Sequence, residues 1–168
     1  MHRGQGTRNR RLLWSAHFLE LLWVRDAVEA RAGALRLDRR ADWAATGASP
    51  FGVGFRGRLD DTSRKEFWLY DALGPRIWIH RDNEQAPERP LVFVLELERR
   101  AELPRGEAGA RRQPGDLREL RVHGPVAPSL PEFVGPTIAH VQGAHLLELI
   151  VGDGRSARRI SDLLVLRS

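Results

Sequence analysis

Two histidines that could act together, His140 and His145, stand five positions apart in the C-terminal third of the chain. A two-residue turn at Gln142 and Gly143 would place them opposite each other in a β-hairpin, with both imidazoles on one face. Directly opposed residues have Cβ atoms about 5 Å apart, so the two rings could share a proton or occupy two ligand positions of one metal ion. The spacing therefore predicts a cross-strand histidine pair with acid–base or metal-binding chemistry.

The geometry of this pair depends on the turn. A strand that runs straight through would send the two histidines to opposite faces because their separation is odd, and a bulge at Gly143 would return them to one face. In the hairpin both rings adjoin apolar side chains, and the loss of hydration would lower their pKa values. Glu148 or His80 would complete a catalytic set.

Gly52–Gly57 matches the pattern G-x-G-x-x-G, in which backbone N–H groups approach a phosphate at the start of a helix. Here the glycines alternate with apolar residues in a strand pattern, and no helix pattern follows them. We therefore expect a strand with one glycine face, against which a ring or another backbone packs closely.

His80-Arg81-Asp82 matches the start of a kinase catalytic loop, but Pro87 stands where the magnesium-binding asparagine is needed. The chain is also much too short for that fold. Strand alternation instead places Trp78, His80 and Asp82 on one side at the end of a strand. This makes Trp78 and His80 candidates for contact with a ligand.

Glu96 and Glu98 end the most apolar strand pattern, where carboxylates can hold a divalent metal in nucleases. Such sites use a following lysine, which is missing here. If segments 76–81 and 90–98 pair as a hairpin, Glu96 lies roughly 16 Å from His80, so the two would not share a site. The pattern favours a solvated strand end.

The basic residues of the chain are almost all arginine, and Lys65 is the single lysine. Four of the 27 basic residues lie in the first eleven positions, where there is no acid, so 23 basic and 22 acidic residues remain in residues 12–168. The body of the protein is therefore nearly neutral, which argues against a basic nucleic-acid-binding domain. The chain has no cysteine, which excludes disulfides and thiolate metal sites and is consistent with a cytoplasmic protein.

The positions of the elements follow from the apolar spacing. Residues 1–10 read as a flexible basic arm, and apolar residues at three- and four-residue spacing from about 11 to 32 predict a helix that stops at Gly33. The longest nearly apolar stretch, Leu12 to Val24, is interrupted by His17 and Glu20 and is shorter than the ~20 residues needed to cross a membrane, so we expect no membrane partner. Residues 99–116 read as a mobile arginine-rich loop.

Strand patterns fill most of the remaining chain, at 51–59, 66–71, 76–80, 91–95, 117–122, 137–151 and 159–166. We expect 66–71 to pair with 51–59, and 91–95, which is apolar on both faces, to be central in a sheet. Pro125, Pro128 and Pro131 mark either an ordered surface connection or a docking ribbon.

These elements predict an α+β fold that is mainly antiparallel β. We expect a curled sheet, a barrel or a sandwich, of about seven or eight strands with one N-terminal helix packed on it. Residues 11–168 would form a single globular domain.

Three functions fit this architecture. The first is a ligand-binding domain with a small-molecule site on the concave sheet face, lined by Trp68, Trp78, His80, His140 and His145. The second is a hydrolase or metal-dependent enzyme that uses the histidine pair. The third is an interaction module that applies the basic arm and the arginine-rich loop to an acidic protein or to RNA.

Overall fold

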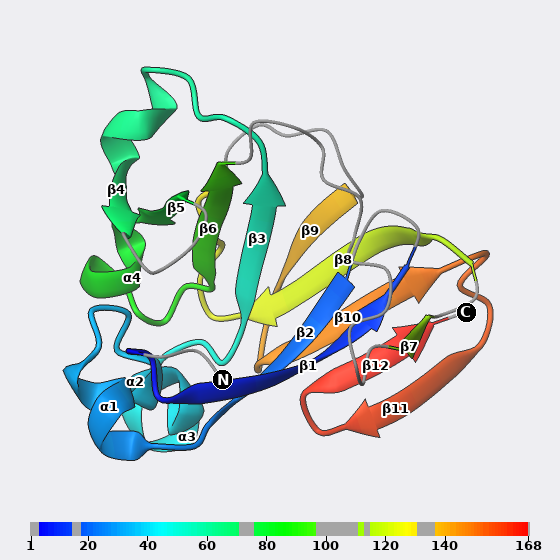
Figure 1. Ribbon diagram of the computed structural model, residues 1–168. Coiled ribbons are helices and arrows are strands. Elements are labelled where there is room, and N and C mark those ends of the chain that lie inside the picture. Colours follow the sequence, from blue (N-terminus) through cyan, green and yellow to red (C-terminus); the bar gives the residue numbers. More distant parts are fainter. Residues whose placement is uncertain are drawn as a thin grey trace.

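The computed structural model describes residues 4–14, 18–70, 76–96, 111–112, 115–130 and 137–167, which form three β-sheets and several short helices (Figure 1). The strands are β1 (Thr7–Leu13), β2 (Phe18–Val24), β3 (Gly52–Arg56), β4 (Phe67–Tyr70), β5 (Arg76–His80), β6 (Leu91–Glu96), β7 (Arg111–Arg112), β8 (Leu117–Gly124), β9 (Thr137–Gln142), β10 (Leu146–Val151), β11 (Ala157–Ser161) and β12 (Leu164–Arg167). The helices are α1 (Ala27–Ala32), α2 (Leu37–Ala41), α3 (Trp43–Thr46), α4 (Asp82–Gln85) and the 3-10 helix η1 (Ser63–Glu66). The prediction of a mainly β protein is confirmed.

The expected long N-terminal helix is wrong. β1 and β2 form an antiparallel hairpin, paired in continuous register from Thr7 opposite Val24 to Leu13 opposite Phe18. Residues 7–10 therefore lie in β1 and not in a flexible arm. The apolar residues of this segment are numerous enough to fit both faces of a two-stranded ribbon as well as one broad helix face. The pairing with β1 satisfies the backbone groups on one edge of β2.

Helical structure after the hairpin is confined to short pieces. The Asp26 carboxylate accepts hydrogen bonds of 3.0 Å from the backbone N–H groups of Val28 and Glu29, which caps α1, and α1 stops at the expected Gly33. Within the described part of the chain, no helix is long and apolar enough to cross a membrane.

One sheet has the strand order β3-β6-β5-β4. β6 is interior, as its apolar residues on both faces predict, and it pairs antiparallel with β5. β3 instead pairs parallel with β6, and β4 pairs with β5, so the expected hairpin between 51–59 and 66–71 is wrong. The glycine-faced strand is confirmed, since a Cβ at Gly54 would overlap the ring of Phe93 on β6.

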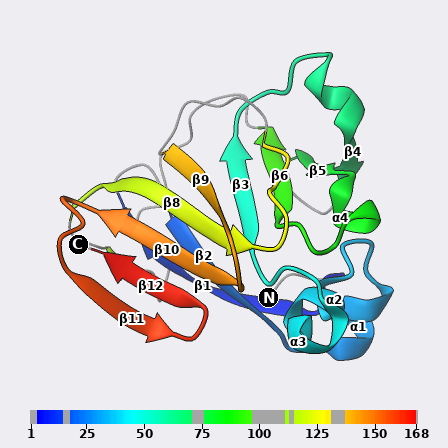
Figure 2. The same ribbon diagram turned by 180° about the vertical axis from the view of Figure 1, so that it is seen from behind.

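The five-stranded sheet has the order β11-β12-β10-β8-β9, with β9 and β11 at its edges (Figure 2). β8 pairs antiparallel with β10 but parallel with β9, and β10 pairs parallel with β12. The strand pairing in this sheet is thus mixed, with parallel as well as antiparallel pairs. The described residues contain more strands than expected, and their sheets do not close into a barrel.

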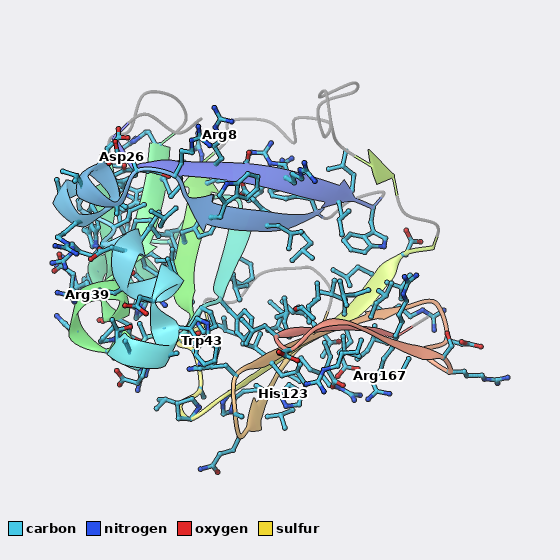
Figure 3. The ribbon with its side chains drawn as sticks, turned by 90° about the horizontal axis from the view of Figure 1, so that it is seen from below. Arg8, Asp26, Arg39, Trp43, His123 and Arg167 are labelled. Carbon is cyan, nitrogen blue, oxygen red and sulfur yellow. The ribbon has the colours of Figure 1, made fainter. Side chains whose placement is uncertain are left out.

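A core lies between the β1–β2 hairpin and the five-stranded sheet, where side chains fill the space between the two layers (Figure 3). Val122 on β8 is fully buried there, together with Trp14 from the end of β1 and Val53 from β3. The two faces of the four-stranded sheet carry further clusters, one around Ile79 and one around Val94.

A buried arginine joins the short helices to this four-stranded sheet. Arg40 of α2 donates hydrogen bonds to the backbone carbonyls of Ser49 at 2.8 Å and Arg89 at 2.9 Å, and to the side-chain oxygen of Asn83 at 3.1 Å. Burial lowers the pKa of Arg40 to about 10. The guanidinium remains charged at neutral pH and serves as a multiple donor to otherwise unpaired oxygens.

Candidate functional site

The expected hairpin between the two histidine strands is wrong, because β8 lies between β9 and β10. His140 on β9 is in register with Val122, and Leu147 on β10 is in register with the same Val122 from the other side. Alternation then places His140 and His145 on the core-facing side of the sheet, but two strands and two residues apart, about 12 Å at the backbone. The two histidines share a face without forming the predicted directly opposed pair.

Each histidine has its own surroundings at the end of β8. His140 Nε2 donates a hydrogen bond of 3.1 Å to the carbonyl oxygen of Gly124. The His145 ring meets Trp43 and Phe51 edge-on, with ring centroids 5.7 and 6.2 Å away, and Figure 3 shows Trp43 on α3 beside the five-stranded sheet. Burial lowers the pKa of His145, which keeps this ring neutral near pH 7.

The His145 site contains a buried Nδ1 that has no hydrogen-bond partner among the described residues. A metal would need further ligands nearby, and the described residues form no group of three His, Asp or Glu side chains that could hold one. A binding role for His140 or His145 stays a prediction, without a metal-ligand set to support it.

Glu148 lies on β10 and His145 directly precedes this strand. The two positions differ by an odd number, so Glu148 lies on the opposite face of the five-stranded sheet from His145. Its carboxylate is buried, and Oε1 accepts hydrogen bonds of 2.9 and 3.1 Å from Arg167. His123 Nε2 lies 3.2 Å from Oε2, and Figure 3 shows His123 and Arg167 on this outer face. The carboxylate is therefore fully engaged and cannot complete a set with His140 and His145.

The electrostatics of Glu148 agree with a structural anion. Burial alone would raise its pKa, but the hydrogen bonds from Arg167 and His123 outweigh this effect and hold the pKa below the ordinary glutamate value. A general acid at neutral pH needs the opposite shift. Nothing in this arrangement prepares Glu148 for proton transfer.

The residues predicted to line a ligand site on the four-stranded sheet are divided between its faces. Trp68 is opposite Ile79 and Leu69 is opposite Trp78, so the two tryptophans point to opposite sides. His80 shares the face of Trp78 and packs edge-on against Phe67, with ring centroids 4.9 Å apart. Trp68, Trp78 and His80 therefore do not converge on one site.

Trp78 is covered by charged groups of its own chain. Its Nε1 donates a hydrogen bond of 2.9 Å to Glu96, and the guanidinium carbons of Arg64 and Arg76 lie 5.3 and 5.6 Å from the ring centroid. These cation–π contacts and the hydrogen bond account for an indole at this position without a ligand. Glu98 lies outside the described residues.

The hydrogen bonds around His80 show how the proline-containing segment is held. The backbone N–H of Asp82 donates to His80 Nδ1 at 3.2 Å, and the Asp82 carboxylate accepts from Arg89 at 2.7 Å and from the Ser129 hydroxyl at 2.9 Å. Because the Ser129 hydroxyl donates to Asp82 and not to His80, Ser129 and His80 do not form the hydrogen-bonded pair that activates a serine nucleophile. The bonds attach residues 125–130 to α4, as expected for an ordered connection; residue 131 lies outside the described chain.

Another group of side chains does converge, on the β1–β2 hairpin. Arg8 is directly opposite Trp23, and Arg10 is directly opposite Leu21, so these four side chains share one face. The two arginines are exposed, and the exposed fractions of Leu21 and Trp23 are both 42%. Together with Leu22, which is 45% exposed on the other face, they form what we call the hairpin surface.

The hairpin surface has positive charge that the described part of the chain does not neutralise. Among the described residues, neither Arg8 nor Arg10 has an ion-pair or hydrogen-bond partner, and Figure 3 shows Arg8 on the far side of the molecule from His123 and Arg167. The single acid of the hairpin, Glu20, faces Asn9 and Arg11 on β1. Two free guanidinium groups therefore lie beside exposed apolar side chains.

The hairpin surface was missed from the sequence because residues 11–32 were interpreted as a helix. A signal was available: Arg8 and Arg10 alternate, as strand residues on one face do, and Phe18–Val24 contains one polar residue in seven. The arginine-rich loop 99–116, the other expected basic element, lies mostly outside the described residues. Arg111–Arg112 form β7, which pairs parallel with β1.

No family model, no curated protein and no solved structure matches this chain. The choice between functions therefore rests on the geometry of the chain itself.

Proposed function

We propose that this protein is an interaction module whose hairpin surface binds an acidic segment of a partner protein. The observation that carries the proposal is the pairing in register of two unneutralised arginines, Arg8 and Arg10, with two exposed apolar side chains, Trp23 and Leu21. An acidic partner would supply the carboxylates that the described chain does not.

The residue types suit a protein interface. Tryptophan and arginine are enriched among the side chains that contribute most to protein–protein binding, and charged groups are otherwise depleted at interface centres. A guanidinium accepts a carboxylate in a two-bond geometry and is always charged. Burial of the remaining exposed area of Leu21, Leu22 and Trp23 would add a hydrophobic contribution.

A protein is favoured over RNA by the apolar side chains. Single-stranded nucleic acids are bound on successive aromatic rings within a broad basic groove. Here one tryptophan is accompanied by two leucines, which offer no flat ring to a base. The nearly neutral body of the chain also provides no extended basic field.

The two other expected functions have less geometric support. The candidate ligand residues Trp68, Trp78 and His80 lie on different faces of one sheet, and the two histidines lie in another sheet. Among the residues that the structure describes, neither a small-molecule site nor an enzymatic site therefore has a converging set of side chains to support it.

The test uses a charge-removing double variant with a matched control. Arg8→Ser with Arg10→Ser removes the two hairpin charges, and Arg158→Ser with Arg159→Ser removes two charges from β11, whose residues are also exposed. Binding of labelled poly-glutamate and of a single-stranded RNA is measured by fluorescence anisotropy at low and high salt. We expect the hairpin variant to lose at least about tenfold in poly-glutamate affinity, equivalent to about 1.4 kcal/mol, and the control about twofold or less.

Equal losses in the two double variants would show non-specific charge attraction and would contradict the proposal. Tighter binding of RNA than of poly-glutamate, lost in the hairpin variant, would reassign the surface to nucleic acid. Circular dichroism confirms that each variant is folded before its affinity is compared.

A further inference from the structure

We infer that the acidic partner binds as an added β-strand along the free edge of β2. This inference rests on the proposed function and specifies its binding mode. It starts from the strand order β2-β1-β7, in which β2 is outermost. Its seven residues pair with β1 on one side, and no described strand or backbone group pairs with residues 18–23 on the other.

The sequence of β2 lacks the features that usually prevent strand addition at an edge, and α2 contacts part of this strand. Natural edge strands are protected by lysine, proline, bulges or charges directed at the edge. Phe18–Val24 contains no lysine or proline, its register with β1 is continuous, and its one charged residue, Glu20, is engaged by Asn9 and Arg11. The outward N–H and C=O groups of β2 are therefore open to another strand.

β11, an edge strand of the five-stranded sheet, shows the contrast. All five of its residues are exposed, two of them are the charged Arg158 and Arg159, and its register with β12 is irregular between Arg159 and Ser161. These are the usual protections of an edge. β11 thus carries edge protections that the sequence of β2 lacks.

The side chains around β2 specify what kind of strand would fit. An added strand would meet Leu21 and Trp23 on one face and Leu22 on the other, so apolar contact is available on both sides. Neighbouring strands are about 4.8 Å apart, which places the added strand about 10 Å from β1. Extended arginine and glutamate side chains together can span this distance, so acidic residues at alternate positions would reach Arg8 and Arg10.

Charge also favours an acidic peptide over a second copy of this chain as the occupant. If the β2 edges of two copies paired, Arg8 and Arg10 of both copies would lie in one continuous sheet, and neither copy would supply a carboxylate to neutralise them. A peptide in which glutamate alternates with valine supplies both the charge and the β-propensity that the edge lacks.

The experiment compares two labelled peptides on the intact protein. One is a nine-residue peptide of alternating glutamate and valine, and the other has the same sequence with its central amides N-methylated, which removes its main-chain donors and keeps its charge. We expect the methylated peptide to bind at least tenfold more weakly. Hydrogen–deuterium exchange of the segment 18–24 should slow when the unmethylated peptide is added.

The outcomes separate this inference from the proposed function. Equal binding of both peptides without slower exchange in 18–24 would overturn strand addition and leave acidic-partner binding intact. Failure of both peptides and of poly-glutamate to bind would overturn both proposals. Slow exchange in 18–24 that depends on protein concentration without peptide would make a second copy the occupant and overturn the acidic-peptide inference.

Discussion

Replacement of Glu148 by glutamine tests whether this carboxylate stabilises the fold or has a catalytic role. In the native protein Glu148 is 6% exposed, and its two oxygens meet Arg167 at 2.9 and 3.1 Å and His123 at 3.2 Å. Glutamine keeps the shape and one carbonyl acceptor but removes the charge. The variant should therefore fold, with a weaker attachment between β8, β10 and β12.

The size of the effect follows from these contacts. A hydrogen bond to a charged group contributes about 1.5–3 kcal/mol, and breaking a buried ion pair costs roughly 3–5 kcal/mol. The Arg167 side chain is 38% exposed, so water screens part of its interaction, and glutamine preserves one acceptor. We expect Glu148→Gln to lower the free energy of unfolding by about 2 kcal/mol, or the Tm by roughly 4–8 °C for a chain of this size.

Thermal unfolding followed by circular dichroism at pH 7 measures this loss. Glu119→Gln is the matched control, because Glu119 lies on the same sheet face and pairs with Arg121 in a more exposed position. Exposed pairs contribute about 0–1 kcal/mol, so the control should lose much less. Unchanged stability of Glu148→Gln would refute a structural role for this carboxylate.

The pH dependence provides an independent check. Because the pKa of Glu148 is lowered in the folded state, its stabilising contribution is present above the unfolded-state pKa of about 4.3 and is lost as the pH falls through the folded value. The difference in stability between wild type and Glu148→Gln should therefore shrink in strong acid. A difference of the same size at pH 7 and in strong acid would contradict the electrostatic explanation.

Three further substitutions test other parts of the fold. Arg40→Met should lower the free energy of unfolding by roughly 2–4 kcal/mol in urea titrations, because it removes the donor to the buried Ser49 carbonyl and to other oxygens. An unchanged urea midpoint would show that burying the charge destabilises the fold as much as its hydrogen bonds stabilise it. Burial lowers the pKa of His145, so the stability that the neutral ring contributes is complete above about pH 6.5 and is lost as the pH falls toward the lower folded value. His145→Phe should therefore reduce the decline of Tm just below pH 6.5. An identical pH profile of Tm in the variant would exclude His145 as the cause of that decline. Gly54→Val should destabilise the protein by about 1–3 kcal/mol, because the valine side chain would overlap the ring of Phe93. Adding Phe93→Ala should recover part of this loss in thermal unfolding. If the double variant recovers no stability, the strain does not come from Phe93.

Several features of the fold followed from local sequence because they depend on one strand or one turn at a time. The apolar run of β6 predicted an interior strand, and the glycines of β3 predicted a face on which a ring packs, here the ring of Phe93. Gly33 marked the end of a helix correctly, although the helix is only the short α1. In each case steric fit or burial of consecutive residues decides the result.

The tertiary structure alone decided how these segments pair. The spacing of apolar residues between Leu12 and Ala30 suits a helix, but the backbone groups on one edge of Phe18–Val24 pair with Thr7–Leu13 instead. Likewise, β8 lies between the strands of His140 and His145, so the faces on which the two histidines lie follow from alternation only when this strand order is known. Sheet hydrogen bonds join residues distant in sequence, so side-chain periodicity can indicate a strand and its faces but not the strand beside it.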